Sequence, residues 1–149
     1  MTDLTVGQST DPVAQGAVVA HYEKIVDCAA VNLAAATAHE LFDIPAGMLH
    51  LSTVVEPLTA EGAAATIDIG DADPDALIDG ADVNQIATPH VSGDAVTAEV
   101  YSLQGASAGK LLLADTTFTL TPSILLDAAV FRVKSIWIDM RSALNDPAA

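Results

Sequence analysis

The sequence contains little cysteine and few aromatic residues, and each scarcity narrows the possible functions. The chain has 149 residues and one cysteine, Cys28, so no disulfide can form within it. No nucleophile motif surrounds Cys28, and we interpret it as a small buried hydrophobic residue. Aromatic residues make up 4% of the chain, which leaves few ring platforms of the kind with which proteins hold sugars.

Basic residues are also scarce. Five Lys and Arg residues stand against 20 Asp and Glu residues, and the formal net charge is -15. The negative electrostatic field of such a protein repels phosphate backbones and anionic lipid headgroups, so we expect no nucleic-acid partner and no membrane partner. No apolar run approaches the ~18 residues of a membrane span, and no signal peptide is recognisable after Met1. We therefore expect folding inside a cell.

Catalytic motifs are absent from the sequence as well. It has no G-x-S-x-G elbow, no phosphate-binding loop and no dinucleotide-binding turn. The four histidines, His21, His39, His50 and His90, are too far apart for a local zinc motif. Two of the many carboxylates suffice for glycoside hydrolysis, but nothing in the sequence locates such a pair. We predict that the protein is not an enzyme, with no catalytic residues and no cofactor.

Short alternating apolar stretches are what the sequence does contain. They predict an all-β fold, a β-sandwich or jelly-roll-like single domain over residues 17–149. Residues 1–16 are polar and have no apolar period, which predicts a flexible N-terminal arm. The alanine-rich residues 29–38 suit either a helix or a strand with a loop, and we favour the strand and loop. The predicted strands lie in AVVAHYEKIV, MLHLSTVV, ATIDI, AVTAEV, TTFTLT and VFRVKSIWID.

The clearest turn signal is IPAG at residues 44–47. It fits a type I turn with proline at its second position and glycine at its fourth, and it predicts a β-hairpin. In the strand that follows, Leu49, Leu51 and Val55 share one face and His50 lies on the other. We expect the leucine face to be the buried one.

The last strand, VFRVKSIWID, has an irregular apolar pattern. Phe131 and Val133 alternate with basic residues, and the apolar parity then changes to Ile136 and Ile138. A β-bulge near Ser135 explains this change of parity.

The aspartate-rich stretch IDIGDADPDALIDGAD, residues 67–82, suggests a cation site at first sight. The EF-hand pattern fails because Ala76 stands where the loop needs glycine. Local capping explains the stretch better: Asp73 caps one short helical turn, Pro74 begins it and Gly80 ends it. A calcium site of another shape remains an alternative. Its ligands would be Asp71, Asp73, Asp75 and Asp82.

Five segments together resemble a known family. They are LFDIPAGMLHLSTVVEPLT, ATIDIGDADPDALIDGADV, AVTAEVYSL, ADTTFTLTPS and VFRVKSIWID, and they cover roughly residues 40–138. This pattern resembles the capsid decoration, or cement, proteins of tailed bacteriophages. The resemblance implies a homo-oligomer, with a trimer favoured, on the outer surface of the virion capsid. It also implies synthesis in the host cytoplasm and binding to the major capsid protein, whose neighbouring subunits the protein would bridge.

Four residues are candidates for interface contacts. Leu4 and Val6 are apolar residues of the arm, and Tyr101 lies in a predicted strand. Trp137 is either an interface anchor or a core residue. Two alternative functions remain open: a phage tail, neck or fibre component, and a calcium-dependent carbohydrate-binding or adhesion β-sandwich.

Overall fold

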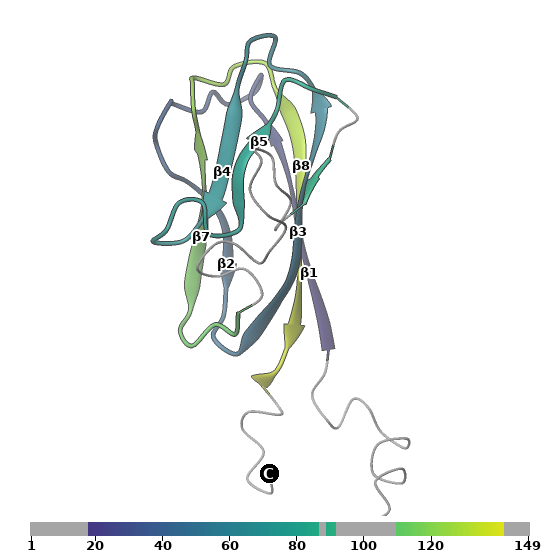
Figure 1. Ribbon diagram of the computed structural model, residues 1–149, viewed down its shortest axis with the longest axis vertical. Coiled ribbons are helices and arrows are strands. Elements are labelled where there is room, and N and C mark those ends of the chain that lie inside the picture. Colours follow the sequence, from purple (N-terminus) through teal and green to yellow (C-terminus); the bar gives the residue numbers. More distant parts are fainter. Residues whose placement is uncertain (1–17, 87–88, 92–109, 142–149) are drawn as a thin grey trace, which may run out of the picture.

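The chain folds into two four-stranded antiparallel sheets that lie face to face, as the computed structural model shows (Figure 1). It describes residues 18–86, 89–91 and 110–141. Sheet I has the strand order β1-β8-β3-β6, and sheet II has the order β2-β7-β4-β5. The strands of sheet I are β1 (Val18–Asp27), β8 (Val130–Asp139), β3 (Met48–Thr59) and β6 (His90–Val91). Those of sheet II are β2 (His39–Ile44), β7 (Thr116–Pro122), β4 (Thr66–Gly70) and β5 (Ile78–Asp82).

This architecture confirms the predicted all-β sandwich. None of the elements within the described residues is a helix. The predicted strand AVTAEV and the predicted arm, residues 1–16, lie outside the described residues. The alanine-rich residues 29–38 form a loop with one isolated bridge, Leu33 to Leu126, so the predicted loop is confirmed, whereas this segment contains neither a strand nor a helix.

The core lies between the two sheets, and alternation of inward and outward side chains is clearest in β4, β7 and β8. Ile67 and Ile69 of β4 are completely buried, and so, within 1%, are Phe118 and Leu120 of β7. Trp137 of β8 is also completely buried, with its ring centroid 5.5 Å from that of Phe118 in the opposite sheet. The inward faces that the sequence predicted for β4 and β7 are therefore confirmed.

The predicted bulge near Ser135 is wrong. β8 alternates without interruption, and its register with β1 is continuous from Val18 to Asp27. Ser135 points into the core with 1% of its surface exposed, so Ile136 and Ile138 point outward. The register shift lies in the neighbouring strand β3, between His50 and Ser52.

The predicted faces of β3 are correspondingly wrong at its first half. Val55 is completely buried as expected, but Leu49 lies on the outer side and Leu51 is 53% exposed. His50 takes the inward position, with 3% of its surface exposed. An imidazole is tolerated inside only where its ring nitrogens find partners.

A network of polar side chains meets this requirement. The Nε2 atom of His50 lies 2.9 Å from Oγ1 of Thr53, and that oxygen lies 2.8 Å from Oγ of Ser135. The indole Nε1–H of Trp137 donates to the same serine oxygen over 2.7 Å. The network joins β3 to β8 inside the core. It provides Ser135 and His50 with hydrogen-bond partners at their inward positions.

The network makes stability depend on pH. Burial lowers the pKa of His50 from 6.5 to about 4. Between these two pKa values the imidazole is protonated in the unfolded chain and neutral in the folded chain. The free energy of unfolding therefore decreases as the pH falls from about 6.5 toward about 4. We expect unfolding free energy, measured in urea, to drop by about 2 kcal/mol between about pH 7 and pH 5. A His50→Asn variant should lose this pH dependence of the unfolding free energy, and a His21→Asn variant should keep it. An unchanged pH dependence in His50→Asn would refute its assignment to His50.

The predicted hairpin at residues 44–47 is also wrong, although the local turn chemistry is right. Gly47 has φ of 86°, the left-handed conformation that favours glycine. However, β2 pairs with β7 and β3 pairs with β8, so the turn carries the chain from sheet II to sheet I. The backbone N–H of Ala46 donates to the carboxylate of Asp115 over 2.9 Å and holds the crossing in place.

A buried carboxylate holds the loop before β8. Glu61 is 8% exposed and accepts hydrogen bonds from the backbone N–H groups of Asp127, Ala128 and Ala129 at 2.7–3.1 Å. Burial alone would raise the pKa of Glu61, but these hydrogen bonds outweigh it and lower the pKa. The carboxylate thus supplies acceptors for three backbone donors at the point where the chain enters β8.

Candidate interaction surface

The acidic stretch forms a tight turn and not the predicted helical turn. The N–H of Ala76 donates to the carbonyl of Asp73 over 3.1 Å, and the N–H of Asp73 donates to the carboxylate of Asp71 over 3.0 Å. The chain then enters β5 directly at Ile78. Gly80 has the expected positive φ of 68°, but it lies within a strand and does not end a helix.

The aspartates of this stretch serve local backbone groups. Asp68 accepts a hydrogen bond from the N–H of Gly80, and Asp82 accepts one from Asn84. Burial raises the pKa of Asp68 despite the hydrogen bond from Gly80. Among the residues that the structure describes, no group of three or more His, Cys, Asp or Glu side chains is arranged to hold a metal ion. The structure therefore does not gather the four alternative calcium ligands, Asp71, Asp73, Asp75 and Asp82.

Of the four candidate interface residues, only Trp137 is described. It is completely buried between the sheets, with its ring 4.9 Å from that of His50, so the structure shows the core alternative. Its side chain has no exposed surface with which to anchor a partner. Leu4, Val6 and Tyr101 lie outside the described residues. No helix in the described part of the chain is long and apolar enough to span a membrane.

The outer face of sheet I carries the apolar surface instead. Val19 of β1 lies opposite Ile138 of β8, Ile138 lies opposite Leu49 of β3, and Leu49 bridges to Leu111. Residues that face each other across antiparallel strands point to the same side of a sheet. One apolar row therefore crosses this face from β1 over β8 and β3 to Leu111.

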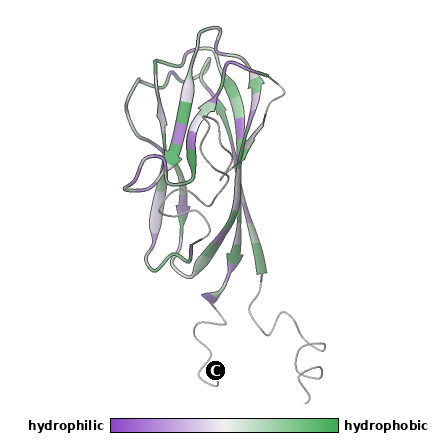
Figure 2. Cartoon of the chain, in the orientation of Figure 1, coloured by the Kyte–Doolittle hydropathy of each residue, from purple (hydrophilic) through white to green (hydrophobic). Residues whose placement is uncertain are grey.

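Two further side chains widen the row. Ile136 lies outward on β8 beside Ile138, and Leu51 is exposed at the irregularity in β3. Apolar colouring runs along these ends of β1, β3 and β8 in Figure 2. We call this surface the apolar patch. It consists of Val19, Leu49, Leu51, Leu111, Ile136 and Ile138.

Charged side chains border the apolar patch on the same face. Arg132 of β8 lies between two glutamates of the flanking strands, 3.4 Å from Glu23 and 3.2 Å from Glu56. Lys134 lies one position closer to the patch, opposite Glu23 and Val54. Such partly exposed pairs contribute little stability, about 0–1 kcal/mol each. They do supply polar groups of both signs at the border of the patch.

The outer face of sheet II has the opposite character. Its four strands contain no Lys or Arg. Thr117 and Thr119 of β7 lie opposite Asp43 and Glu40 of β2, and the hydroxyl of Thr117 donates to Asp43 over 2.6 Å. Asp68 lies opposite Thr121 on the other side of β7. This face is polar and acidic, and it is suited to contact with water.

The difference between the two faces identifies the outer side of sheet I as the candidate interaction surface. Contiguous apolar surface with a polar border is typical of protein contact sites, whereas scattered apolar residues are not. The sequence pattern does not reveal this surface, because it predicts an inward position for the leucines of β3 and the last isoleucines of β8. Uninterrupted alternation in FRVKSIWID would have placed Ile136 and Ile138 outside.

Comparison with known proteins finds structures of similar fold but no matching sequence. No protein-family model and no curated protein matches the sequence. A chain in the capsid asymmetric unit of cyanophage Pam1 has a TM-score of 0.55 at 16% identity, covering 83% of this chain and 86% of that one. A chain of the capsid of Ralstonia phage GP4 has a TM-score of 0.54 at 14% identity, covering 83% of this chain and 84% of that one. A chain of the acidic stable capsid structure of Helicobacter pylori bacteriophage KHP30 has a TM-score of 0.53 at 7% identity, covering 83% of this chain and 89% of that one. The protein therefore shares its fold with chains of bacteriophage capsid structures.

Proposed function

We propose that the protein is a structural protein of a phage virion that decorates the outer surface of the capsid. The observation that carries this proposal is the fold shared with chains of three phage capsid structures, together with the unequal outer faces of the two sheets. In this proposal the apolar patch on sheet I docks on the major capsid protein, and the acidic face of sheet II points to solvent.

Charge supports an outer position. A chain with a formal charge of -15 is unsuited to the inside of a shell packed with DNA, because both carry negative charge. On the outside the same charge keeps decorated particles apart in solution. The scarcity of basic residues is no obstacle there, because the apolar patch supplies the contact.

The proposed role is mechanical. Each copy touches neighbouring subunits of the shell, so that pulling these subunits apart requires several contacts to break together. Once the first contact has formed, the second forms at a high effective concentration. A homo-oligomer, with a trimer favoured, would multiply these contacts and bridge more subunits.

Reconstitution on shells tests the proposal. Purified protein is mixed with capsids of the same phage that lack it, and the particles are sedimented. We expect the protein to sediment with the capsids until its sites are saturated, and the coated capsids to open at higher temperature than bare ones. Protein that stays in the supernatant at every concentration would rule out decoration.

A further inference from the structure

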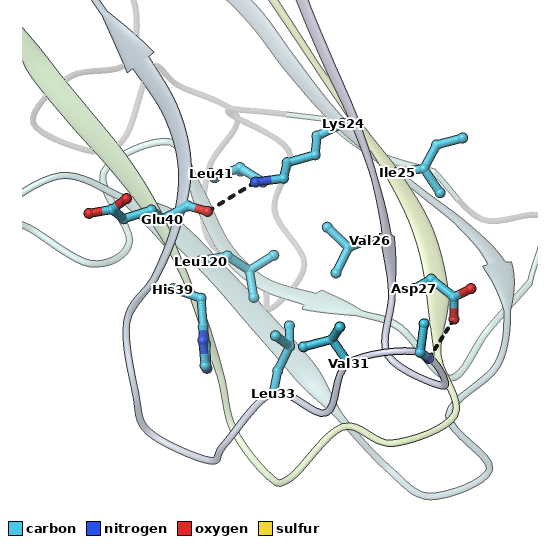
Figure 3. Close-up of a pocket in the computed structure, with 11 residues that line it drawn as sticks. Lys24, Ile25, Val26, Asp27, Val31, Leu33, His39, Glu40, Leu41 and Leu120 are labelled. Atoms are coloured by element: carbon cyan, nitrogen blue, oxygen red, sulfur yellow. Dashed lines mark hydrogen bonds between the residues drawn. The ribbon is translucent and has the colours of Figure 1, made fainter.

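The edges of the two sheets leave a groove between β1 and β2. The groove has a volume of about 420 Å³. Val26, Leu33, Leu41 and Leu120 form its floor and Val31 lies at its rim, whereas the side chain of Ile25, on the same edge, points away from the groove (Figure 3). Leu33, Leu41 and Leu120 are largely buried, whereas Ile25 and Val31 are 54% and 67% exposed. The groove is therefore an apolar slot that opens to solvent.

Both walls of the groove are strand edges. Within the described residues β1 pairs only with β8, and β2 pairs only with β7. Beside the groove the two walls are linked by the rings of Tyr22 and Phe42, 6.0 Å apart, and by Lys24, whose ammonium donates to the carbonyl of Glu40 over 3.3 Å. Backbone N–H and C=O groups at such an edge can pair with an added strand.

We propose that the groove holds the N-terminal segment of the same chain, residues 1–16, as an added strand antiparallel to β1. This segment joins the body at Val18, the first residue of β1, whose far end forms one wall of the groove. Val26 lies about 26 Å further along β1, at ~3.3 Å per residue. Leu4 precedes Val18 by about 14 residues, an extended length of about 46–50 Å, which is enough to fold back and reach the groove.

The sequence of the segment fits this path. Three-residue hairpin loops favour glycine at their last position, and Ala14-Gln15-Gly16 has glycine there. That loop places Val13 opposite Ala17, and counting along both strands then places Leu4 opposite Val26. Val6 falls opposite Lys24 in the same register. Pro12, which cannot donate a hydrogen bond, lies in the outermost strand, where proline is tolerated.

This register brings apolar side chains to the apolar floor. Residues opposite each other in antiparallel strands point to the same side, and Val26 packs against the core. Leu4 and Val6 are two positions apart and therefore share that side, above Leu33 and Leu41. Because the segment is tethered to β1, its effective concentration at the groove is about millimolar, which favours binding of this segment over binding of a separate molecule. The inference concerns the free protein and does not rest on the proposed function.

A disulfide tests the register. In a Cys28→Ala background, Leu4→Cys is combined with Val26→Cys. Opposite residues have Cα atoms about 4.5–5.5 Å apart, within the range of a disulfide. We expect mild oxidation to remove both thiols while the chain keeps the mass of one copy. The matched control combines Leu4→Cys with Thr117→Cys on the outer face of sheet II and should keep its thiols. Equal oxidation of both pairs, no oxidation of the first pair, or covalent dimers alone would overturn the proposal; dimers would mean that the groove takes the segment of a second copy.

Hydrogen exchange tests the same contact without new cysteines. Leu4→Asp places a charge on the groove side of the added strand, and Thr5→Asp places one on the opposite side. We expect the amides of β1 that point into the groove, within Lys24–Asp27, to exchange about tenfold faster in Leu4→Asp than in the natural chain. Thr5→Asp should leave their exchange unchanged. Identical exchange in all three proteins would show that the groove is empty of this segment.

Discussion

Leu51→Glu is expected to abolish binding to phage capsids while the protein stays folded. Leu51 is 53% exposed in the free protein, so the substitution needs no rearrangement of the core. In the proposed complex the same position is shielded from water, and a carboxylate without a partner there costs about 4 kcal/mol. That cost corresponds to roughly a thousandfold weaker binding. Sedimentation of the variant with bare capsids measures the loss.

The chain offers a closely matched control. Leu125 is 50% exposed, and it lies in the loop between β7 and β8, away from the apolar patch. Leu125→Glu therefore adds the same charge at similar exposure, and it should bind capsids as the natural protein does. Equal binding by both variants would remove the apolar patch from the proposed contact. Equal loss in both would indicate that total charge, and not this surface, controls binding.

Trp137→Ala is expected to cause the largest loss of stability, about 3–5 kcal/mol. The indole is completely buried, it contacts Phe118 of the opposite sheet, and its N–H donates to Ser135. Its removal leaves a cavity and takes one donor from the polar network. A domain of this kind has about 5–15 kcal/mol of stability in total, so urea denaturation should show a greatly lowered midpoint.

The neighbouring residue supplies the comparison for this experiment. Ile136→Ala removes an outward apolar side chain from the same strand and should cost about 1 kcal/mol or less. A loss below about 1 kcal/mol in Trp137→Ala would contradict the packing described for the core. It would also restore the interpretation of Trp137 as an interface residue.

Alternation predicts β4 and β7 well because their inward residues are all apolar. Ile67 and Ile69, and then Phe118 and Leu120, stand at every second position, and no polar residue interrupts the pattern. Where a polar residue faces inward the same rule fails. The pattern of β3 places His50 outside, although Thr53 of the same strand supplies its partner inside the core. In β8 the polar Ser135 conceals the alternation and leads to the prediction of a bulge, although Thr53 and Trp137 satisfy its hydroxyl inside the core.

Neighbouring residues determine whether a turn forms, but distant strands determine whether the two strands beside the turn pair with each other. Proline and glycine at residues 44–47 predict a tight turn, and Gly47 has the expected positive φ. Whether the strands on either side pair with each other depends on β7 and β8, which follow about 70 residues or more later in the chain. The hairpin prediction failed for this reason. The apolar patch was missed for a related one, since it combines residues of β1, β3 and β8.

The family resemblance and the shared fold rest on different observations, and both point to phage capsids. The resemblance rests on short sequence segments, whereas the comparison rests on the backbone and finds at most 16% identity among the three structures described. Two interpretations of a phage structural protein differ in number of copies. A decoration protein occurs in proportion to the shell, and a tail, neck or fibre component occurs in few copies per particle.

Quantitative mass spectrometry of purified particles tests the central claim most directly. The ratio of this chain to the major capsid protein is measured in virions that have been freed of unbound protein. Decoration requires a fixed ratio close to a simple fraction of the shell protein, unchanged on further purification. Absence from the particles, or presence at a few copies per virion, would contradict the account.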